Sequence, residues 1–343
     1  MQKLVQALYA AGIIYKGGGV NMEKILEVKN LKKYFPAKKD FFGKTLEYVK
    51  AVDGVDFHIN YGEVLGLVGE SGCGKSTTGR TILRLLDPTE GTILFEGQDI
   101  THFNKKKLKS VYKHMQLIFQ DPFASLNPRK TIGDTLEEVL FVHGMKDREQ
   151  RKEKAQELIQ MVGLRKRDMD KYPHEFSGGQ RQRGVIARAL AVNPKLVICD
   201  EPVSALDVSI QAQIINLMMD LKERLGLAYL FISHDLRVVR YISDRVAVMY
   251  MGKIVEIAPV EELFLNPLHP YSKALLSVIP ALKPGNRREK IVLEGEVPSP
   301  INPPSGCNFR TRCRYATKEC GDVEPTIRLV GNEHFVSCHL YNQ

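Results

Sequence analysis

GESGCGKST, residues 69–77, is the stretch of sequence that decides the fold. An apolar run, VLGLV at 64–68, leads into it, and TTGRTILRLL at 77–86 leaves it with apolar residues at helical spacing. A strand, a glycine loop and a helix form the context that the G-x-x-x-x-G-K-[ST] phosphate loop requires. A chance match in a glycine-rich turn would not explain both flanking elements. The sequence therefore predicts a nucleotide-binding protein.

The residue types of this loop suit the chemistry of phosphate binding. Its glycines let successive backbone N–H groups curl around an anionic phosphate chain, and the following helix adds its positive N-terminal end. Lys75 is expected to reach the outer phosphates and Ser76 to ligate Mg²⁺. The loop residues expected to contact the nucleotide are Gly69, Ser71, Gly72, Cys73, Gly74, Lys75, Ser76 and Thr77.

Composition and charge set the outer limits of the interpretation. The chain has 343 residues, enough for one large domain plus a smaller one or for two medium domains. The net charge of +9 favours an acidic partner such as a membrane surface or nucleic acid, but the positive residues are scattered in short clusters that favour a solvated basic surface. No stretch approaches 18 consecutive apolar residues, so any work on a membrane is expected to pass through a partner.

The N-terminal part divides into an extension and a strand region. Residues 1–21 have a short apolar part followed by KGGG, which is typical of a flexible joint, so they are expected to be a disordered extension or a misplaced start without a function. Alternating segments between 25 and 59 predict antiparallel strands around a charged loop that contains residues 41–43.

The middle of the chain, from about 120 to 185, predicts an inserted helical subdomain. TLEEVLFVHG and DREQRKEKAQELIQMVGL carry apolar residues at three and four spacing. FSGG at 176–179 then precedes another amphipathic helix, with Ser177 in the capping position. A second helix start suited to phosphate therefore lies about a hundred residues beyond the first.

Two later strands end in side chains suited to catalysis. KLVIC at 195–199 predicts a buried parallel strand that ends at Asp200 and Glu201, and ligands sit at the carboxyl ends of such strands. Asp200 suits the Mg²⁺ shell and Glu201 suits a base that orients or deprotonates water, although a surface Asp-Glu pair stays an alternative. The strand LAYLFI at 227–232 delivers His234. A lone histidine is more often structural, but this one follows a strand on the expected side of the sheet.

These pieces in this order resemble the ATP-binding subunit of an ABC transporter over about residues 25–259. The resemblance rests on GESGCGKST, Gln120, FSGGQ, LVICDEP, SALD and His234; the family signature is usually LSGGQ, and Phe176 is a conservative departure. It implies an α/β fold, a P-loop ABC ATPase with a RecA-like core, an antiparallel β subdomain and a helical subdomain. The implied division is a nucleotide-binding domain at 22–262 and a small cysteine-containing extension at 263–343.

The resemblance also implies roles for single residues. Glu201 resembles the catalytic base, His234 the switch that contacts the γ-phosphate, and Gln120 the residue that senses γ-phosphate and magnesium and links to the membrane partner. The magnesium ligands implied are Ser76, Gln120 and Asp200. The residues implied to act on the ATP of another subunit, or to couple the two sites, are Ser177, Gly178, Gly179, Gln180 and Asp207. Tyr34 is the choice for stacking on adenine, with Tyr48 and Phe35 as rivals.

The C-terminal text resembles the oligopeptide and dipeptide importer ATPases within that family. LFLNPLHPYSKALLS at 263–277, EGEVPSP at 294–300 and FQDPFASLNPR at 119–129 carry this likeness, which importers of nickel, glutathione and antimicrobial peptides share. The implied partners are a second identical or homologous ATPase subunit, two membrane permease subunits and, through them, a solute-binding protein. The implied location is peripheral, on the cytoplasmic face of the inner membrane, without nucleic acid.

Four of the six cysteines fall near the C-terminus. Cys73 and Cys199 are expected to pack in the interior. The others have the spacing C-x5-C-x6-C-x17-C, which matches no C-x2-C zinc pattern, and four thiolates suit a tetrahedral metal or an iron–sulfur cluster. Some peptide-importer ATPases carry a four-iron cluster here, so a structural 4Fe–4S cluster is predicted, with zinc or no metal as alternatives. The cysteines concerned are Cys307, Cys313, Cys320 and Cys338.

Two rival functions are less consistent with the sequence. A soluble ABC ATPase acting on nucleic acid would suit the basic charge, but DNA-repair types need a long coiled-coil insertion between the phosphate loop and the signature. Translation-factor types carry two cassettes, and this chain has one set of motifs. An exporter normally brings its own transmembrane helices.

Overall fold

The computed structural model describes residues 23–39, 45–278, 291–331 and 333–342. The predicted extension at 1–21 and the loop at 41–43 lie outside these residues. No helix in the described ranges is long and apolar enough to cross a bilayer.

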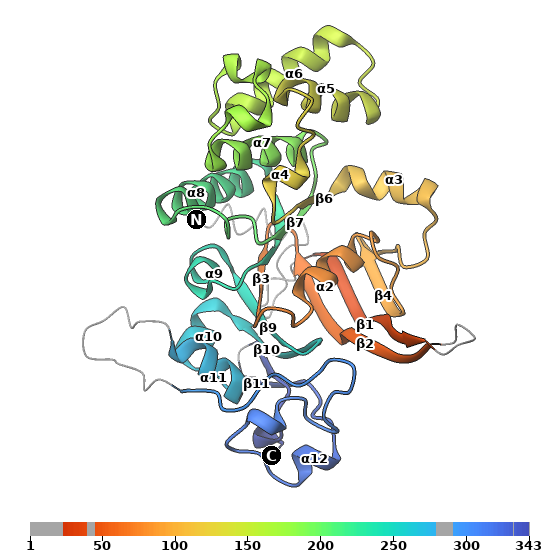
Figure 1. The fold of residues 1–343 in the computed structure, drawn as a ribbon, viewed down its shortest axis with the longest axis vertical. Helices are drawn as coiled ribbons and strands as arrows, with labels where there is room; N and C mark the ends of the chain where they lie inside the picture. The colour runs from red at the N-terminus through yellow and green to blue at the C-terminus, as the bar shows by residue number, and fades with distance from the viewer. Residues whose placement is uncertain (1–22, 40–44, 279–290, 332, 343) are drawn as a thin grey trace, which may run out of the picture.

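A largely parallel sheet forms the centre of the molecule and continues into antiparallel strands at one edge (Figure 1). Across the part of the chain that is described, its order is β11-β12-β10-β9-β3-β8-β7-β6. Strands β6, β7, β8, β3 and β9 run parallel, whereas β10, β12 and β11 add on in antiparallel fashion. The bounds are β3 (Val64–Val68), β6 (Met115–Ile118), β7 (Leu196–Asp200), β8 (Ala228–Ile232), β9 (Arg245–Tyr250), β10 (Lys253–Pro259), β11 (Arg328–Gly331) and β12 (His334–Val336).

Strand β3 shows why the sequence places this sheet in the interior. All five of its residues are buried, because both faces of a parallel sheet are covered. Val64 and Val68 pack into the hydrophobic cluster on one face, and Leu65 and Leu67 pack into the cluster on the other. Alternate residues of a strand point to opposite faces, so this short run joins the two halves of the core.

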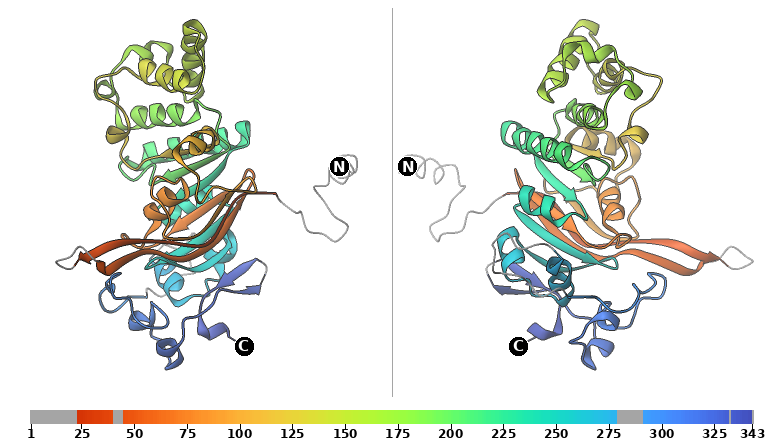
Figure 2. Two further views of the ribbon diagram at one scale, coloured as in Figure 1. Left: turned by 90° about the vertical axis from the view of Figure 1, so that its right-hand side faces the viewer. Right: turned by 60° about the vertical axis from the view of Figure 1, so that its left-hand side comes forward.

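A second, antiparallel sheet covers one side of the first. Its order is β2-β1-β4-β5, and the long strands β1 and β2 project from the body of the molecule (Figure 2). Its buried side chains, such as Ile25 and Val52, belong to the same cluster as Leu65. The bounds are β1 (Lys24–Lys39), β2 (Thr45–Asn60), β4 (Glu90–Phe95) and β5 (Gln98–Asp99).

The helices occupy the flanks, and α5 and α6 lie at the end of the molecule opposite the C-terminal segment (Figure 1). The helix after the phosphate loop is α2 (Lys75–Ile82), and α7 (Gly178–Leu190) is opened by Ser177, whose hydroxyl accepts the N–H of Gln180. The other α-helices are α3 (Lys105–His114), α4 (Pro122–Ser125), α5 (Ile132–Val142), α6 (Arg148–Met161), α8 (Val208–Leu225), α9 (Leu236–Ile242), α10 (Val260–Leu265), α11 (Pro270–Ser277) and α12 (Glu319–Asp322). The predicted α/β cassette fold is confirmed.

Aromatic side chains hold the C-terminal segment against this core. Tyr250 at the end of β9, Tyr271 of α11 and Phe309 of the following segment are buried and pack with ring centroids 4.7 to 5.5 Å apart. Burying an aromatic side chain contributes roughly 1.5–3 kcal/mol. Segments about sixty residues apart in the sequence therefore share one interior.

A buried carboxylate completes this junction. Glu256 of β10 is fully buried and accepts the backbone N–H groups of Leu268 and His269 at 2.7 and 2.9 Å. Its Oε1 also lies 2.7 Å from the ring nitrogen Nε2 of His334 in β12. A buried charge persists only when such partners surround it, so Glu256 ties α11 and the last strand to the sheet.

His269 is expected to make stability depend on pH. Its Nδ1 accepts the N–H of Tyr271 at 3.1 Å, and burial lowers its pKa to about 4, with nearby Glu256 opposing and Lys273 assisting that shift. The unfolded chain therefore takes up a proton as the pH falls below 6.5, while the folded chain stays neutral until about 4. Lowering the pH from 7.5 to 5 should remove about 2 kcal/mol of unfolding free energy through this residue.

His269→Asn provides the comparison, because asparagine also accepts a hydrogen bond at a helix start but does not titrate here. Denaturant unfolding at the two pH values should show a smaller loss for the variant than for the unchanged chain. Equal losses in both proteins would contradict the assignment.

Candidate nucleotide-binding site

The phosphate loop runs from the end of β3 to the start of α2 and fits closely against neighbouring backbone. Gly74 has φ 109°, in the region that favours glycine, and a Cβ there would lie 2.0 Å from the carbonyl oxygen of Ala51. A Cβ on Gly69 would lie 2.1 Å from the carbonyl oxygen of Met249. The loop therefore accepts no side chain at these two positions.

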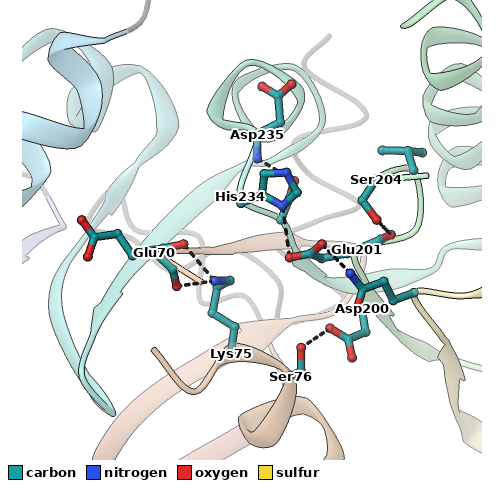
Figure 3. Close-up of polar contacts among 12 residues, drawn as sticks. Glu70, Lys75, Ser76, Asp200, Glu201, Ser204, His234 and Asp235 are labelled. Carbon is teal, nitrogen blue, oxygen red and sulfur yellow. Dashed lines mark hydrogen bonds and ion pairs between the residues drawn. The ribbon is translucent and has the colours of Figure 1, made fainter. Parts of the chain in front are cut away.

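Lys75 lies inside the loop rather than on its surface. Its side chain is buried, and Nζ donates to the carbonyl oxygens of Gly69 and Glu70 at 2.8 and 2.9 Å. Figure 3 shows the Lys75 side chain turned toward the backbone of Glu70. The ammonium is thus placed where a phosphate chain wrapped by the loop would meet it.

Ser76 and Asp200 meet across two elements. Ser76 Oγ at the start of α2 donates to Asp200 Oδ1 at the end of β7 over 2.6 Å (Figure 3). Asp200 Oδ2 is buried, lies 3.6 Å from the Arg80 guanidinium and accepts no hydrogen bond from the described residues. Burial raises the pKa of Asp200 because the charged carboxylate loses hydration. A hydroxyl beside a carboxylate oxygen that accepts no hydrogen bond from the described residues is a ligand pair suited to Mg²⁺.

Glu201 is held from two sides. Gln120 Nε2 donates to its Oε2 over 3.0 Å. On the other side His234 Nδ1 lies 3.1 Å from its Oε1, as Figure 3 shows. Its backbone has φ 48°, a left-handed conformation that a non-glycine residue seldom adopts. Such backbone strain gathers at functional sites. The ends of β6, β7 and β8 thus bring three predicted residues together.

One open cavity of about 540 Å³ joins these parts. Its lining includes Gln120, Glu201 and His234 together with the loop from 70 to 77, which is the arrangement expected for a triphosphate site. The structure thus brings together in one place the residues that the sequence analysis assigned to phosphate, magnesium and water.

The signature residues lie elsewhere. Ser177, Gly178 and Gln180 are exposed at the start of α7, and none of the described residues from 177 to 180 lines the cavity. A Cβ on Gly179 would lie 2.4 Å from Cγ2 of Ile210, so α7 and α8 start close together. Asp207, which precedes α8, is also exposed. This second helix start faces outward from its own chain.

Tyr34 is engaged away from the cavity. Its hydroxyl donates to the carboxylate of Asp53, and Lys50 Nζ lies 5.9 Å from the centre of its ring. Neither Tyr34 nor its rivals Phe35 and Tyr48 belong to the described cavity lining. The adenine-stacking role of Tyr34 stays a prediction.

The structure adds lining residues that sequence reasoning missed. Lys50 and Ala51 come from β2, and Tyr250 from β9. Val297, Pro298 and Pro300 come from the C-terminal segment, more than two hundred residues after the loop. The alternating pattern of β2 indicated a strand that contains Lys50 and Ala51. No local sequence pattern links residue 297 to residue 70.

The iron–sulfur cluster predicted from four cysteines is wrong. They are free thiols that line a cavity of about 90 Å³, but the described residues contain no group of three or more His, Cys, Asp or Glu side chains that could hold a metal ion. Burial raises the pKa of Cys307 to about 11 and also raises the pKa values of Cys313 and Cys338. Hydrogen bonds and aromatic packing hold this segment, including a bond from the Cys307 N–H to the Cys320 carbonyl at 2.8 Å.

Two family models match the chain. The model described as "ABC transporter" matches residues 52–204, and the model described as "Oligopeptide/dipeptide transporter, C-terminal region" matches residues 255–320. The first covers the phosphate loop, Gln120 and the Asp200–Glu201 pair. The second begins within β10 and includes three of the four C-terminal cysteines.

Curated relatives match nearly the whole length. The oligopeptide transport ATP-binding protein AppF of Bacillus subtilis is 58% identical over 325 residues, which is 94% of this chain and 99% of AppF. The dipeptide transport ATP-binding protein DppF of Escherichia coli is 49% identical over 321 residues, 94% of this chain and 96% of DppF. The dimeric structure of MJ0796, described as a bacterial ABC transporter cassette, has a TM-score of 0.62 at 29% identity and covers 68% of this chain and 98% of that one.

Proposed function

This chain belongs to the ABC transporter ATP-binding family, and from that premise we propose that it energises the import of dipeptides or oligopeptides through a membrane permease. Membership makes it an ATPase whose hydrolysis is coupled to transport. The observation that carries the choice of solute is the match of residues 255–320 to the oligopeptide and dipeptide transporter C-terminal region. Relatives named for peptide transport, at 49–58% identity, support the same choice.

We propose the following roles for single residues in ATP hydrolysis. Glu201 receives a proton from the attacking water, and Gln120 and His234 orient its carboxylate through the contacts at 3.0 and 3.1 Å. Lys75 exchanges its bonds to loop carbonyls for bonds to phosphate oxygens. Ser76, Asp200 and Gln120 would hold Mg²⁺, which would supply positive charge to offset the charge of the phosphates.

A dimer explains the outward position of the signature. Ser177 to Gln180 present a capped helix start, which attracts anions, on a surface away from the chain's own cavity. We propose that this helix start covers the ATP of a second, identical or homologous subunit, and that Asp207 contacts the same boundary. The related cassette MJ0796 has been solved as a dimer.

The remaining assignments follow the same proposal. Two permease subunits hold the ATPase pair on the cytoplasmic face of the inner membrane, and a solute-binding protein delivers the peptide. The chain divides into the nucleotide-binding domain at 22–262, with its helical subdomain near 120–185, and the extension at 263–343.

Peptide uptake tests the proposed solute. Cells that lack this gene should lose uptake of radiolabelled di- to pentapeptides and retain uptake of free amino acids. The unchanged gene should restore uptake, whereas Lys75→Ala should not, because the phosphates lose their buried ammonium. Lys152→Ala, at an exposed lysine of α6, is the matched control and should restore uptake.

The same cells separate the alternatives. Unchanged peptide uptake together with lost uptake of nickel or glutathione would replace the peptide assignment with an importer of that solute. Unchanged uptake of all these solutes would contradict an importer role.

A further inference from the structure

Glu70, a non-glycine residue of the phosphate loop, is held by the C-terminal part of the chain. Its backbone N–H donates to the hydroxyl oxygen of Tyr271 in α11 over 2.9 Å. Its carboxylate accepts hydrogen bonds from both terminal nitrogens of Arg312, at 2.9 and 3.3 Å. Its carbonyl oxygen accepts the ammonium of Lys75. Two of these three contacts come from residues at least two hundred positions further along the chain.

The ion pair between Arg312 and Glu70 is sheltered from solvent. The Arg312 side chain is 8% exposed and that of Glu70 is 27% exposed. A guanidinium that bonds to both carboxylate oxygens fixes the orientation of the carboxylate and also neutralises its charge. Figure 3 shows the Glu70 carboxylate turned away from Lys75, so the two ends of this residue serve different partners.

A second contact brings the same segment to the cavity itself. The backbone N–H of Lys50 in β2 donates to the carbonyl oxygen of Pro300 over 3.1 Å. Val297, Pro298 and Pro300 line the cavity together with Glu70 and the rest of the loop. The segment from 297 to 312 therefore touches the site both at its wall and at its phosphate loop.

We propose that Arg312 is a positioning residue of the nucleotide site, which fixes the phosphate loop through Glu70 and offsets the negative charge of that carboxylate. ATP affinity then depends on the C-terminal extension, and ATP in turn stabilises the extension by the same factor, as linkage requires. This inference concerns the ATP site and goes beyond the transport proposal.

Electrostatics explain why the pairing matters. ATP brings several negative charges into a loop whose own Glu70 carries another. With Arg312 in place, the pair is neutral and the loop offers Lys75 and its N–H groups to the phosphates. Without Arg312, an uncompensated carboxylate stands next to the phosphate site and the Glu70 side chain loses the two hydrogen bonds that orient it.

The main test measures affinity in the purified full-length chain. Arg312→Met keeps much of the side chain's length but removes its charge, and should weaken binding of the imido analogue of ATP with Mg²⁺ about tenfold by calorimetry. The ATPase KM should rise in parallel with kcat changed less than twofold. Arg314→Met, an exposed arginine two positions away, makes the same charge change and should leave affinity unaltered.

A charge-matched double variant distinguishes this role from general damage to the fold. Arg312→Met combined with Glu70→Gln removes both charges and should recover most of the lost affinity. Arg312→Lys keeps the positive charge and should bind the analogue within about threefold of the unchanged chain. An Arg312→Met chain that binds normally, or a double variant no better than the single one, would overturn the proposal.

The unchanged protein supplies a test that needs no variant. Hydrogen exchange at the amides of Arg312 and Cys313, which donate to the carbonyls of Phe309 and Arg310, should slow several-fold when the analogue binds. Protection confined to the loop at 69–77, with unchanged exchange at 312 and 313, would contradict the coupling. Either failure leaves the peptide-import proposal intact, because these measurements involve no permease or peptide.

Discussion

Glu201→Gln should lower the ATP turnover rate by about two to three orders of magnitude while leaving ATP bound. Glutamine keeps the length and shape of the side chain between Gln120 and His234 but cannot accept a proton from water. Binding is expected to rest on the loop and Lys75, which the change does not touch. If the proposed dimer closes on ATP and reopens after hydrolysis, the variant should accumulate as a closed dimer in ATP and Mg²⁺.

Two measurements check this expectation. Phosphate release reports turnover, and size-exclusion chromatography with and without ATP reports the dimer. Glu223→Gln, at an exposed position in α8, is the matched control and should behave like the unchanged chain. Rapid turnover by the Glu201 variant would remove this residue as the base.

Asp200→Asn should have the second large effect, because it weakens the binding of Mg²⁺ rather than the activation of water. In the unchanged chain the Ser76 hydroxyl lies 2.6 Å from the Asp200 carboxylate, and the amide oxygen of asparagine can still accept a hydrogen bond from it. The negative charge that suits a divalent cation is lost. The Mg²⁺ concentration for half-maximal ATPase activity should rise by about 10- to 100-fold. Mn²⁺, which binds such ligands more tightly, should restore part of the activity.

A magnesium titration of the ATPase rate measures this shift. Asp220→Asn, an exposed residue of α8, supplies the control with the same chemical change. An unaltered magnesium requirement in Asp200→Asn would show that the buried Oδ2 is not part of the metal site.

Local patterns predicted the parts of the site that adjoin strands and helix starts. The run at 64–68 and the helix after it placed Lys75 and Ser76, and the buried strand β7 placed Asp200 beside them. These predictions depend only on short-range periodicity and on the rule that ligands meet the carboxyl ends of parallel strands. The left-handed backbone of Glu201 has no such local signal, because the surrounding packing imposes it.

Contacts between distant segments escaped the sequence analysis. Nothing near residue 312 indicates that its guanidinium meets a carboxylate in the phosphate loop. The cysteine spacing suggested a metal, but spacing alone does not determine whether thiols are ionised or oriented for a ligand. Their burial, which raises the pKa of Cys307, emerges only from the folded chain.

The buried carboxylate of Glu256 predicts the effect of mutations that truncate the chain before β12. Its partner His334 lies in β12, a strand that is hydrogen-bonded to β10. A frameshift or premature stop before codon 334 would leave Glu256 with its two backbone N–H donors but without its ring partner, and losing one partner of a buried polar group costs about 1–3 kcal/mol. Nonsense alleles that remove β12 are therefore expected to lower the stability of the fold, although they spare every motif assigned to ATP.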